Sequence, residues 1–217
     1  MKTNPFTDTF WFLLGQTDDH HLTRFQYPLT IFFAALLIAG IVIAYTNWQA
    51  DMGQRTQKHL WTAFMRIMIG GMWLQGSLWK LPLPNSDGLH YWTSQEVQYA
   101  AFGWHKWLAQ NVFLGFFQIL DPIVYLTETG LGVSLILGFF VRPMAVIGIL
   151  FTAQLWLGLY QHPGEWPWEY VFLTFVLALF AMHNAGRSLG LDAQIKRAPF
   201  GPFEGGGAIA RFTRWST

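Results

Sequence analysis

Five apolar segments, each about as long as a bilayer is thick, dominate the pattern of hydrophobic and polar positions along this chain. A helix needs about 20 mostly apolar residues to cross the hydrocarbon core of a membrane. The segments cover residues 28–48, 60–81, 122–141, 143–160 and 168–185. Asp121–Pro122 and Arg142–Pro143 are predicted helix starts, because proline is tolerated in a first turn. The pattern predicts an all-α integral membrane protein, a bundle of five transmembrane helices.

Glycines recur inside the second and third segments, and aromatic residues gather near the segment ends. The glycines are Gly70, Gly71, Gly76, Gly130, Gly132 and Gly138. Small residues let helices approach closely in lipid, so we expect tight helix contacts there. The aromatics are Trp48, Trp61, Trp79, Trp156, Tyr160, Trp166, Trp168 and Tyr170. Such rings favour the head-group region, which is the expected aromatic belt.

The chain outside the apolar segments divides into three parts. Residues 82–113 open with a turn-rich stretch and continue with many aromatics. We expect one or two interfacial helices on the outer leaflet there. Residues 1–27 carry Asp8, Asp18 and Asp19 and do not resemble a cleavable signal, so the first apolar segment is the expected signal anchor. The tail after residue 198 is rich in Gly and Pro and is expected to be irregular.

Composition agrees with lipid as part of the solvent. The 217 residues are 53% hydrophobic and only 12% charged, whereas soluble domains carry about a quarter charged residues. A net charge of +1 gives no electrostatic case for binding nucleic acid. Cysteine is absent, which excludes disulfides, thiolate metal sites, iron–sulfur clusters and cysteine nucleophiles. Redox chemistry would need a bound cofactor, a quinone or a partner subunit.

Basic residues are distributed unevenly between the two ends of the predicted helices. One set of connecting segments holds Arg55, Lys58, Arg142, Arg187, Lys196, Arg197, Arg211 and Arg214, and the other holds Lys2, Arg24, Lys80 and Lys106. Basic residues favour the cytoplasmic side. We therefore expect a multi-pass protein of a bacterial or archaeal cytoplasmic membrane, with its N-terminus outside and its C-terminus inside.

Glu128 and Lys80 are the ionisable residues that most need an explanation. A charge at the centre of a membrane helix costs about 2.5–3.5 kcal/mol on insertion scales. Glu128 lies near the outer end of one predicted helix and Lys80 near the outer end of another, so the two can pair. Such a pair would either fix the bundle structurally or form a site for a quinone or a small anion, with Trp79 and the aromatic loop as a cover. Alternatively, the two groups are unrelated.

Arg66 and Arg142 are the next candidates. Arg66 lies inside the second segment, where it would snorkel to the inner face, bond to a neighbouring helix, pair with Glu128 or bind a lipid phosphate. Arg142, at the inner boundary, is explained by the distribution of basic residues, with a direct role in binding as the alternative. Both are retained as candidate binding residues.

The histidines show no arrangement typical of a metal or haem site. His20 and His21 precede the first segment, His90 and His105 fall in the outer loop, and His59 and His183 lie near the inner boundary. No mid-helix pair could hold haem, and no nucleophile elbow or phosphate-binding glycine loop is present. We therefore predict no metal.

An ordered set of short motifs resembles the DoxX/DoxD family of membrane proteins. They are Arg66-Ile67-Met68-Ile69-Gly70 leading to Gly76 and Lys80-Leu81, then Glu128-Thr129-Gly130-Leu131-Gly132 leading to Gly138 and Arg142, and finally Gly186-Arg187-Ser188-Leu189-Gly190-Leu191-Asp192. The resemblance implies a four-helix core over residues 60–192. Residues 1–59 would then add one N-terminal transmembrane helix and 193–217 a cytoplasmic tail. The long aromatic loop is similar to that of the DoxD branch.

The resemblance also implies an activity. DoxD-type proteins are a subunit of thiosulfate:quinone oxidoreductase, which joins two thiosulfates into tetrathionate and passes the electrons to quinone. By matching position, Arg66, Lys80, Glu128 and Arg142 would be the polar residues carried over.

The leading hypothesis is therefore a membrane subunit of a quinone-linked redox complex, with lipids, quinone and other subunits as partners. Lys80 would attract an anionic substrate or hydrogen-bond a quinone carbonyl, and Glu128 would exchange a proton. Trp79, Trp104 and His105 would border the quinone head group. The alternative is a non-catalytic structural subunit of a larger respiratory or photosynthetic complex. A small-solute transporter is a weaker option, because no inverted repeat is visible.

Overall fold

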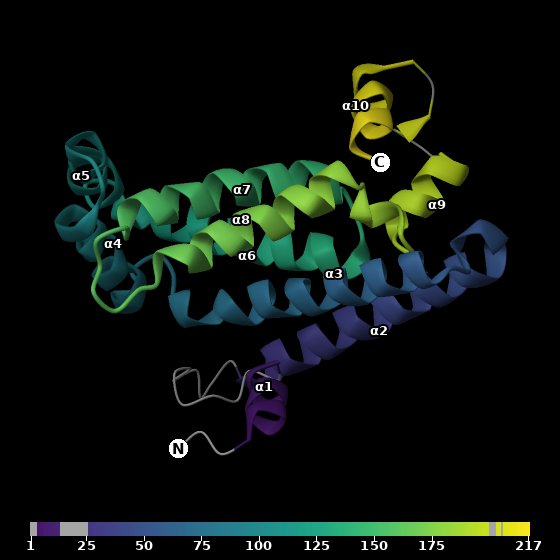
Figure 1. The fold of residues 1–217 in the computed structure, drawn as a ribbon, viewed down its shortest axis with the longest axis horizontal. Coiled ribbons are helices and arrows are strands. Elements are labelled where there is room, and N and C mark those ends of the chain that lie inside the picture. The colour runs from purple at the N-terminus through teal and green to yellow at the C-terminus, as the bar shows by residue number, and fades with distance from the viewer. Residues whose placement is uncertain (1–3, 14–25, 200–202, 205) are drawn as a thin grey trace.

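The computed structural model describes residues 4–13, 26–199, 203–204 and 206–217, which are helical with no β-strand among them (Figure 1). The α-helices are α1 (Pro5–Leu13), α2 (Gln26–Ala50), α3 (Gln57–Gly76), α4 (Asp87–Tyr99), α5 (Gly103–Leu108), α6 (Phe117–Leu137), α7 (Val141–Gly158), α8 (Pro167–Met182), α9 (Leu191–Arg197) and α10 (Ala208–Ser216). Shorter turns are η1 (Met52–Gln54), η2 (Leu78–Lys80), η3 (Ala109–Phe113, a π-helix) and η4 (Ala185–Arg187). The all-α class is confirmed. Predictions that involve Lys2, Asp18, Asp19, His20, His21 and Arg24 fall outside the described residues.

Three of the described helices are long and apolar enough to cross a membrane. They are Pro28–Ala50 within α2, α6 and α7, with 23, 21 and 18 residues. The apolar part of α8, Trp168–Met182, is shorter. Helix α3 has 20 residues, but it contains Lys58, Arg66 and several other polar residues. These helices indicate a membrane protein.

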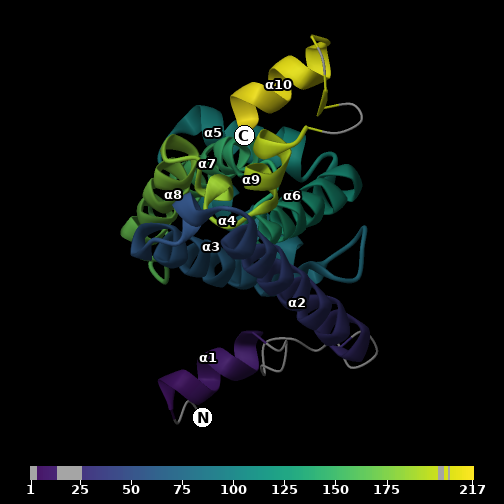
Figure 2. The same ribbon diagram turned by 90° about the vertical axis from the view of Figure 1, so that its right-hand side faces the viewer.

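The central bundle consists of two closely packed helix pairs, α3 with α6 and α7 with α8, joined where α6 lies beside α7. These four helices run alongside one another, and α2 lies outside them against α6 (Figures 1 and 2). The largest hydrophobic cluster joins α6, α7 and α8, and its buried members are Leu131, Leu135, Val141, Ala145, Leu177, Phe180, Ala181 and Ala185. Packing of α6 against both pairs therefore holds the bundle together.

Two glycines explain how closely α3 approaches α6. A Cβ atom added to Gly70 would lie 2.8 Å from the Leu135 Cβ and 2.9 Å from the Gly132 carbonyl oxygen. A Cβ added to Gly132 would lie 2.8 Å from the Leu74 nitrogen and 3.0 Å from the Gly70 carbonyl oxygen. The two backbones touch, so the predicted close contact is confirmed here. Gly76, by contrast, faces open space.

The predicted helix starts are right for one proline and wrong for the other. Pro143 lies in the first turn of α7, as expected. Pro122 lies inside α6, which begins five residues earlier, at Phe117. The ring of Phe117 is buried against Leu89 and Val124 and anchors an extra turn. A proline this close to a helix start removes only one backbone hydrogen bond, which such packing can offset.

The two ends of the bundle differ. Helices α4 and α5 and the turn η3 cover one end, and η4, α9 and α10 lie at the other (Figure 1). The prediction of helices within residues 82–113 is confirmed. The prediction of an irregular tail is wrong for α10, because the glycines and prolines precede residue 208. One side of α10 exposes the apolar residues Ile209, Phe212 and Trp215, the pattern of an amphipathic helix.

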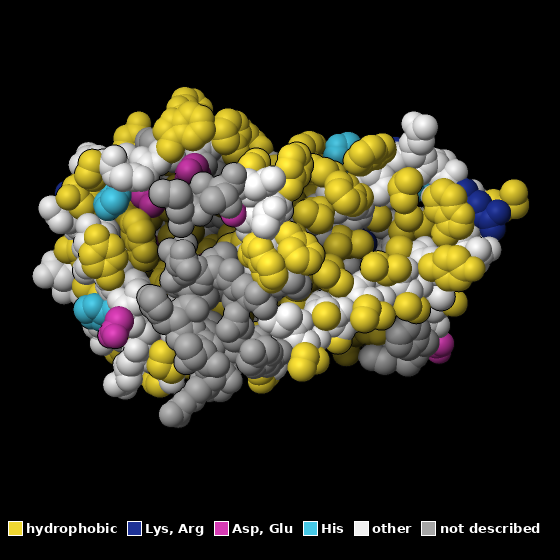
Figure 3. Space-filling model, turned by 90° about the horizontal axis from the view of Figure 1, so that it is seen from below, with side chains coloured by type: hydrophobic (Ala, Val, Ile, Leu, Met, Phe, Trp, Pro, Cys, Tyr) yellow, Lys and Arg dark blue, Asp and Glu magenta, His cyan; other side chains and the backbone are white. Residues whose placement is uncertain are grey.

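The outer surface of the bundle is apolar. Helix α2 exposes Ile31, Ile38, Ile41 and Val42, and α6, α7 and α8 expose similar side chains. Figure 3 shows one face largely covered by hydrophobic side chains, with most visible acidic groups toward the left end. A helix such as α2, apolar all round and scarcely buried by protein, is typical of contact with lipid.

Candidate functional site

A cavity of about 340 Å³ lies within the half of the bundle that α4 and α5 cover. It is lined by Trp79, Lys80, Leu89, Trp92, Thr93, Glu96, Phe113, Leu120, Ile123, Val124, Thr127, Glu128, Phe151, Gln154, Leu155, Leu159, Glu165 and Tyr170. Small-molecule sites typically measure about 300–1,000 Å³ and combine apolar walls with a few polar groups. Size and lining therefore fit a compact ligand with an aromatic or apolar body.

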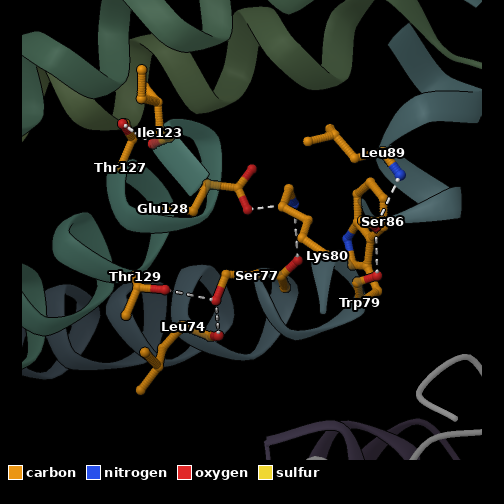
Figure 4. A network of polar contacts seen from close by, with 11 residues as sticks. Leu74, Ser77, Trp79, Lys80, Ser86, Leu89, Ile123, Thr127, Glu128 and Thr129 are labelled. Atoms are coloured by element: carbon orange, nitrogen blue, oxygen red, sulfur yellow. Dashed lines mark hydrogen bonds and ion pairs between the residues drawn. The ribbon is translucent and has the colours of Figure 1, made fainter. Parts of the chain in front are cut away.

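The first polar group in the wall is the ion pair of Lys80 and Glu128. Helix α3 ends at Gly76, and the turn η2 directs Lys80 back toward α6 (Figure 4). The Lys80 Nζ lies 2.5 Å from the Glu128 Oε2, and the two side chains are only 3% and 8% exposed. The ammonium also lies 3.9 Å from the centre of the Trp79 ring, which favours a cation. The predicted pair is therefore present.

Neighbouring hydrogen bonds fix the elements that carry this pair. The Ser77 and Thr129 hydroxyls lie 3.1 Å apart and join α3 to α6 (Figure 4). The Ser86 backbone N–H donates to the Asp121 carboxylate at 2.9 Å. Since Ser86 is also the N-cap of α4, this contact ties the start of α4 to α6. The covering helix is thus anchored beside Lys80.

The second polar group is Glu96 of α4. Its Oε2 accepts hydrogen bonds from Gln154 Nε2 of α7 at 2.5 Å and contacts His105 Nε2 of α5 at 3.1 Å. Glu96 and His105 are 5% and 1% exposed. Burial raises the pKa of the Glu96 carboxyl, although the contacts with His105 and Gln154 oppose that shift. Glu96 therefore favours its protonated form more than an exposed glutamate does.

The third polar group in the lining is formed by Tyr170 and Glu165, where the Tyr170 hydroxyl donates to the Glu165 carboxylate at 2.9 Å. The charge balance of the whole cavity follows from these three groups. Lys80 is the one cation among the lining residues and is already paired, whereas Glu96 and Glu165 add acidic groups. An anion would meet no uncompensated positive charge here. The arrangement favours a neutral ligand that accepts hydrogen bonds and exchanges protons.

The predicted aromatic and histidine contacts are only partly in the cavity. Trp79 lines it. Trp104 does not line it; this side chain is 59% exposed and stacks on Phe102. His105 lies behind Glu96 rather than in the wall, and its ring contacts Trp104, with 5.2 Å between ring centres.

Arg66 and Arg142 lie away from the cavity. The buried Arg66 guanidinium donates to the carbonyl oxygens of Leu135 and Ile136 at the C-terminal end of α6. Of the predicted roles, bonding to a neighbouring helix is therefore correct, and snorkelling or pairing with Glu128 is wrong. Arg142 donates to the Trp215 carbonyl oxygen of α10 at 2.9 Å. Both arginines stabilise the opposite end of the bundle.

Sequence reasoning missed Glu96, Gln154 and Tyr170 as cavity residues. The signal for Glu96 was a helical spacing: Leu89, Thr93 and Glu96 recur at intervals of four and three and share one buried face of α4. Gln154 and Tyr170 carried no comparable signal, because isolated polar residues in apolar helices are common.

Comparison with known proteins leaves the arrangement unassigned. No protein-family model, curated protein or solved structure matches this chain. The resemblance to the DoxX/DoxD family stays a prediction from the sequence.

Proposed function

We propose that this chain is a membrane subunit of a quinone-linked redox complex and that its cavity binds the quinone head group. The observation that carries the proposal is one apolar, aromatic-walled cavity that contains a buried Lys–Glu pair and a second buried carboxyl group. A quinone is neutral and flat, accepts hydrogen bonds at its carbonyls, and takes up protons when it is reduced. The balance of charge in the cavity supports such a ligand over thiosulfate, which is an anion.

Each group in the wall has a role in this proposal. The Lys80 ammonium donates a hydrogen bond to one carbonyl, and the Glu128 carboxyl exchanges a proton beside it. Trp79 and Trp92 border the head group, and the lipid tail leaves along the apolar helices. The cavity therefore supplies orientation and protons, while the electrons enter from a partner subunit.

The electron donor that we propose to test first is thiosulfate, which the DoxD resemblance implies. Two thiosulfates become one tetrathionate and release two electrons; the quinone takes these two electrons and two protons and becomes a quinol. Thiosulfate would be oxidised on the partner, because the cavity carries no free positive charge to bind it.

We propose five membrane crossings, by α2, α3, α6, α7 and α8, with α2 as an addition to a four-helix core. The N-terminus would lie outside and the C-terminus inside the cytoplasmic membrane of a bacterium or archaeon. The cavity and its α4–α5 cover would then lie at the outer leaflet. The distribution of basic residues supports this orientation.

The test uses the complex purified from its native membrane, with partners identified by mass spectrometry. Thiosulfate-dependent reduction of a short-chain ubiquinone is measured for the wild type and for Glu128→Gln. We expect at least a tenfold loss, since general acid–base groups contribute about 10²–10⁴ in rate. Glu169→Gln is the matched control, because Glu169 is exposed and lies outside the cavity lining. A fully active Glu128→Gln protein would contradict the role of Glu128.

A second candidate is a non-catalytic accessory subunit. It is favoured by the Lys80–Glu128 contact, because the two opposite charges compensate each other at the junction of α3 and α6 and need no ligand to do so. Stoichiometric partner subunits, together with no binding of quinone to this chain, would support this function instead.

A further inference from the structure

Glu96 and His105 form a buried acid–imidazole pair that joins the cavity to the outer side of the α4–α5 cover. The Glu96 carboxylate belongs to the cavity lining, whereas the His105 ring lies one step farther out. The His105 ring contacts two aromatic rings, the exposed Trp104 with 5.2 Å between ring centres and Phe113 of the cavity lining with 6.4 Å. A proton that moves from Glu96 to His105 therefore moves away from the cavity and toward the surface.

The two nitrogens of His105 are in different situations. Nε2 contacts the Glu96 carboxylate at 3.1 Å, while the buried Nδ1 has no hydrogen-bond partner among the described residues. A structural histidine usually has its tautomer fixed by a partner on the second nitrogen. In His105 the Glu96 carboxylate contacts Nε2 and leaves Nδ1 without a partner, so Nδ1 can accept a proton while Nε2 releases one to Glu96.

The carboxylate of Glu96 is held in a defined position. Gln154 donates a hydrogen bond to the Glu96 Oε2 at 2.5 Å. The Glu96 carboxylate can approach the backbone of α7 because residue 158 is a glycine, where an added Cβ would lie 2.5 Å from the same oxygen. Glu96 therefore presents one orientation to both the cavity and His105, as a proton-transfer group requires.

We propose that Glu96 and His105 are a proton relay that connects the cavity to the surface, and that Glu96 supplies one of the two protons that quinone reduction consumes. This inference rests on the proposed function. In the reducing direction the Glu96 carboxyl gives its proton to one quinone oxygen. A proton from the surface side then binds His105 Nδ1, and the resulting imidazolium gives its Nε2 proton to the Glu96 carboxylate. The Lys80–Glu128 pair serves the other oxygen, so two protons accompany the two electrons.

Few other charged or titratable groups face this relay. From α8 and the preceding turn, Tyr170 and Glu165 bond to each other. From α7 the polar contact is Gln154, which does not titrate. On α5, Lys106 donates to the Gln98 carbonyl oxygen at 2.9 Å. Glu96 and His105 are therefore the two titratable groups in direct contact at this side of the cavity.

The experiment separates binding from proton transfer. Binding of a decyl-substituted benzoquinone to the full-length protein is followed by quenching of tryptophan fluorescence, since Trp79 and Trp92 line the cavity. Reduction of the bound quinone is followed by voltammetry of protein films, in which the electrode supplies the electrons. The variants are Glu96→Gln and His105→Ala, the second with and without added imidazole. His90→Ala is the control, because His90 is an exposed histidine of α4.

We expect Glu96→Gln and His105→Ala still to bind quinone and to reduce it about 100-fold more slowly. Imidazole should restore His105→Ala and leave Glu96→Gln and His90→Ala unchanged. Wild-type rates in both variants would overturn the relay and leave the proposed function intact. Loss of rate that imidazole does not restore, together with lost binding, would overturn it in favour of a structural role. Failure of the wild type to bind quinone would overturn the proposed function and the relay together.

Discussion

The Lys80 ammonium and the Glu128 carboxylate meet at 2.5 Å where the end of α3 reaches α6, with both side chains almost fully buried. Each charge alone would be costly at this depth, because an unpaired buried ion loses its hydration and gains nothing in return. The contact therefore makes each residue dependent on the other. The pair can serve the bundle or the cavity, and mutants separate these two roles.

Replacing one member of the pair should destabilise the protein more than replacing both. Lys80→Met leaves Glu128 without its partner and should lower the free energy of unfolding by about 3–5 kcal/mol. The double variant Lys80→Met/Glu128→Leu should recover most of that loss, because apolar packing replaces two buried charges. Chemical unfolding in detergent, combined as a double-mutant cycle, measures the coupling.

The two roles then predict different activities for the double variant. If the pair serves quinone chemistry, the double variant should be folded and inactive. A folded and fully active double variant would make the pair structural. Additive effects of the two single replacements would contradict the pairing itself.

The contact of Gly70 with Gly132 predicts a strong dependence on side-chain size. Gly70→Leu would force α3 and α6 apart, because even a Cβ atom at Gly70 would lie 2.8–2.9 Å from atoms of α6. We expect a loss of stability of at least about 1–3 kcal/mol, the usual cost of overpacking. Thermal unfolding in detergent would measure it. Gly76→Ala is the control, since nothing lies within 4 Å of an added Cβ there, and it should be neutral or slightly stabilising. Equal stability of the two variants would contradict the close helix contact.

Much of the fold could be predicted from the sequence because lipid restricts the options. The length of the apolar segments alone predicted α2, α6 and α7. Lys80 and Glu128 were predicted to pair because an unpaired charge inside a membrane helix is energetically costly. Helix α3 was located in spite of its polar residues. The start of α6 was placed too late, because proline is a local signal and the packing of Phe117 is a tertiary one.

The rest of the site could not be predicted because its partners lie far apart in the chain. Glu96 occurs in a polar loop segment, where an exposed carboxylate is the usual outcome, and its burial depends on Gln154 of α7 and the space at Gly158. The partners of Arg66 are backbone carbonyl oxygens, and because every residue has one, the sequence does not indicate which of them an arginine will contact. The sequence predicted Trp104 at the cavity as one of the aromatic residues of the outer loop, yet an aromatic ring with a polar N–H equally suits an exposed position at a membrane boundary.

Arg66 should matter for stability rather than for activity. Its guanidinium satisfies two carbonyl oxygens at the end of α6 in a fully buried position. Arg66→Met leaves them without a donor, at about 1–3 kcal/mol for each buried unsatisfied group. Arg55 is a matched control, because it also donates to carbonyl oxygens at a helix end, those of Trp48 and Gln49, but is exposed. Arg55→Met should cost well under about 1 kcal/mol, since water replaces its hydrogen bonds. Similar unfolding free energies for the two variants would contradict the role of Arg66.

Asp192, which precedes the tail at the same end of the bundle, should make stability depend on pH. Its carboxylate accepts hydrogen bonds from the backbone N–H groups of Phe140 and Val141 at the start of α7. Burial nevertheless raises its pKa from 3.8 to about 6, against the effect of these bonds and of Arg66 and Arg187. Between pH 4 and 6 the folded state thus binds more protons than the unfolded state. The contribution of Asp192 to the free energy of unfolding should be highest below pH 4 and fall as the pH rises to 6, by up to about 3 kcal/mol.

Asp192→Asn isolates this contribution, because the amide keeps one acceptor oxygen but does not titrate. Other acidic groups, such as Glu96, also have a raised pKa and change stability in the same direction in both proteins. Unfolding free energies measured from pH 4 to pH 7 should therefore fall more steeply for the wild type than for the variant, with the difference confined to the range between 4 and 6. Parallel curves would mean that Asp192 is ionised in the folded state throughout this range, held by its two backbone donors and the nearby arginines.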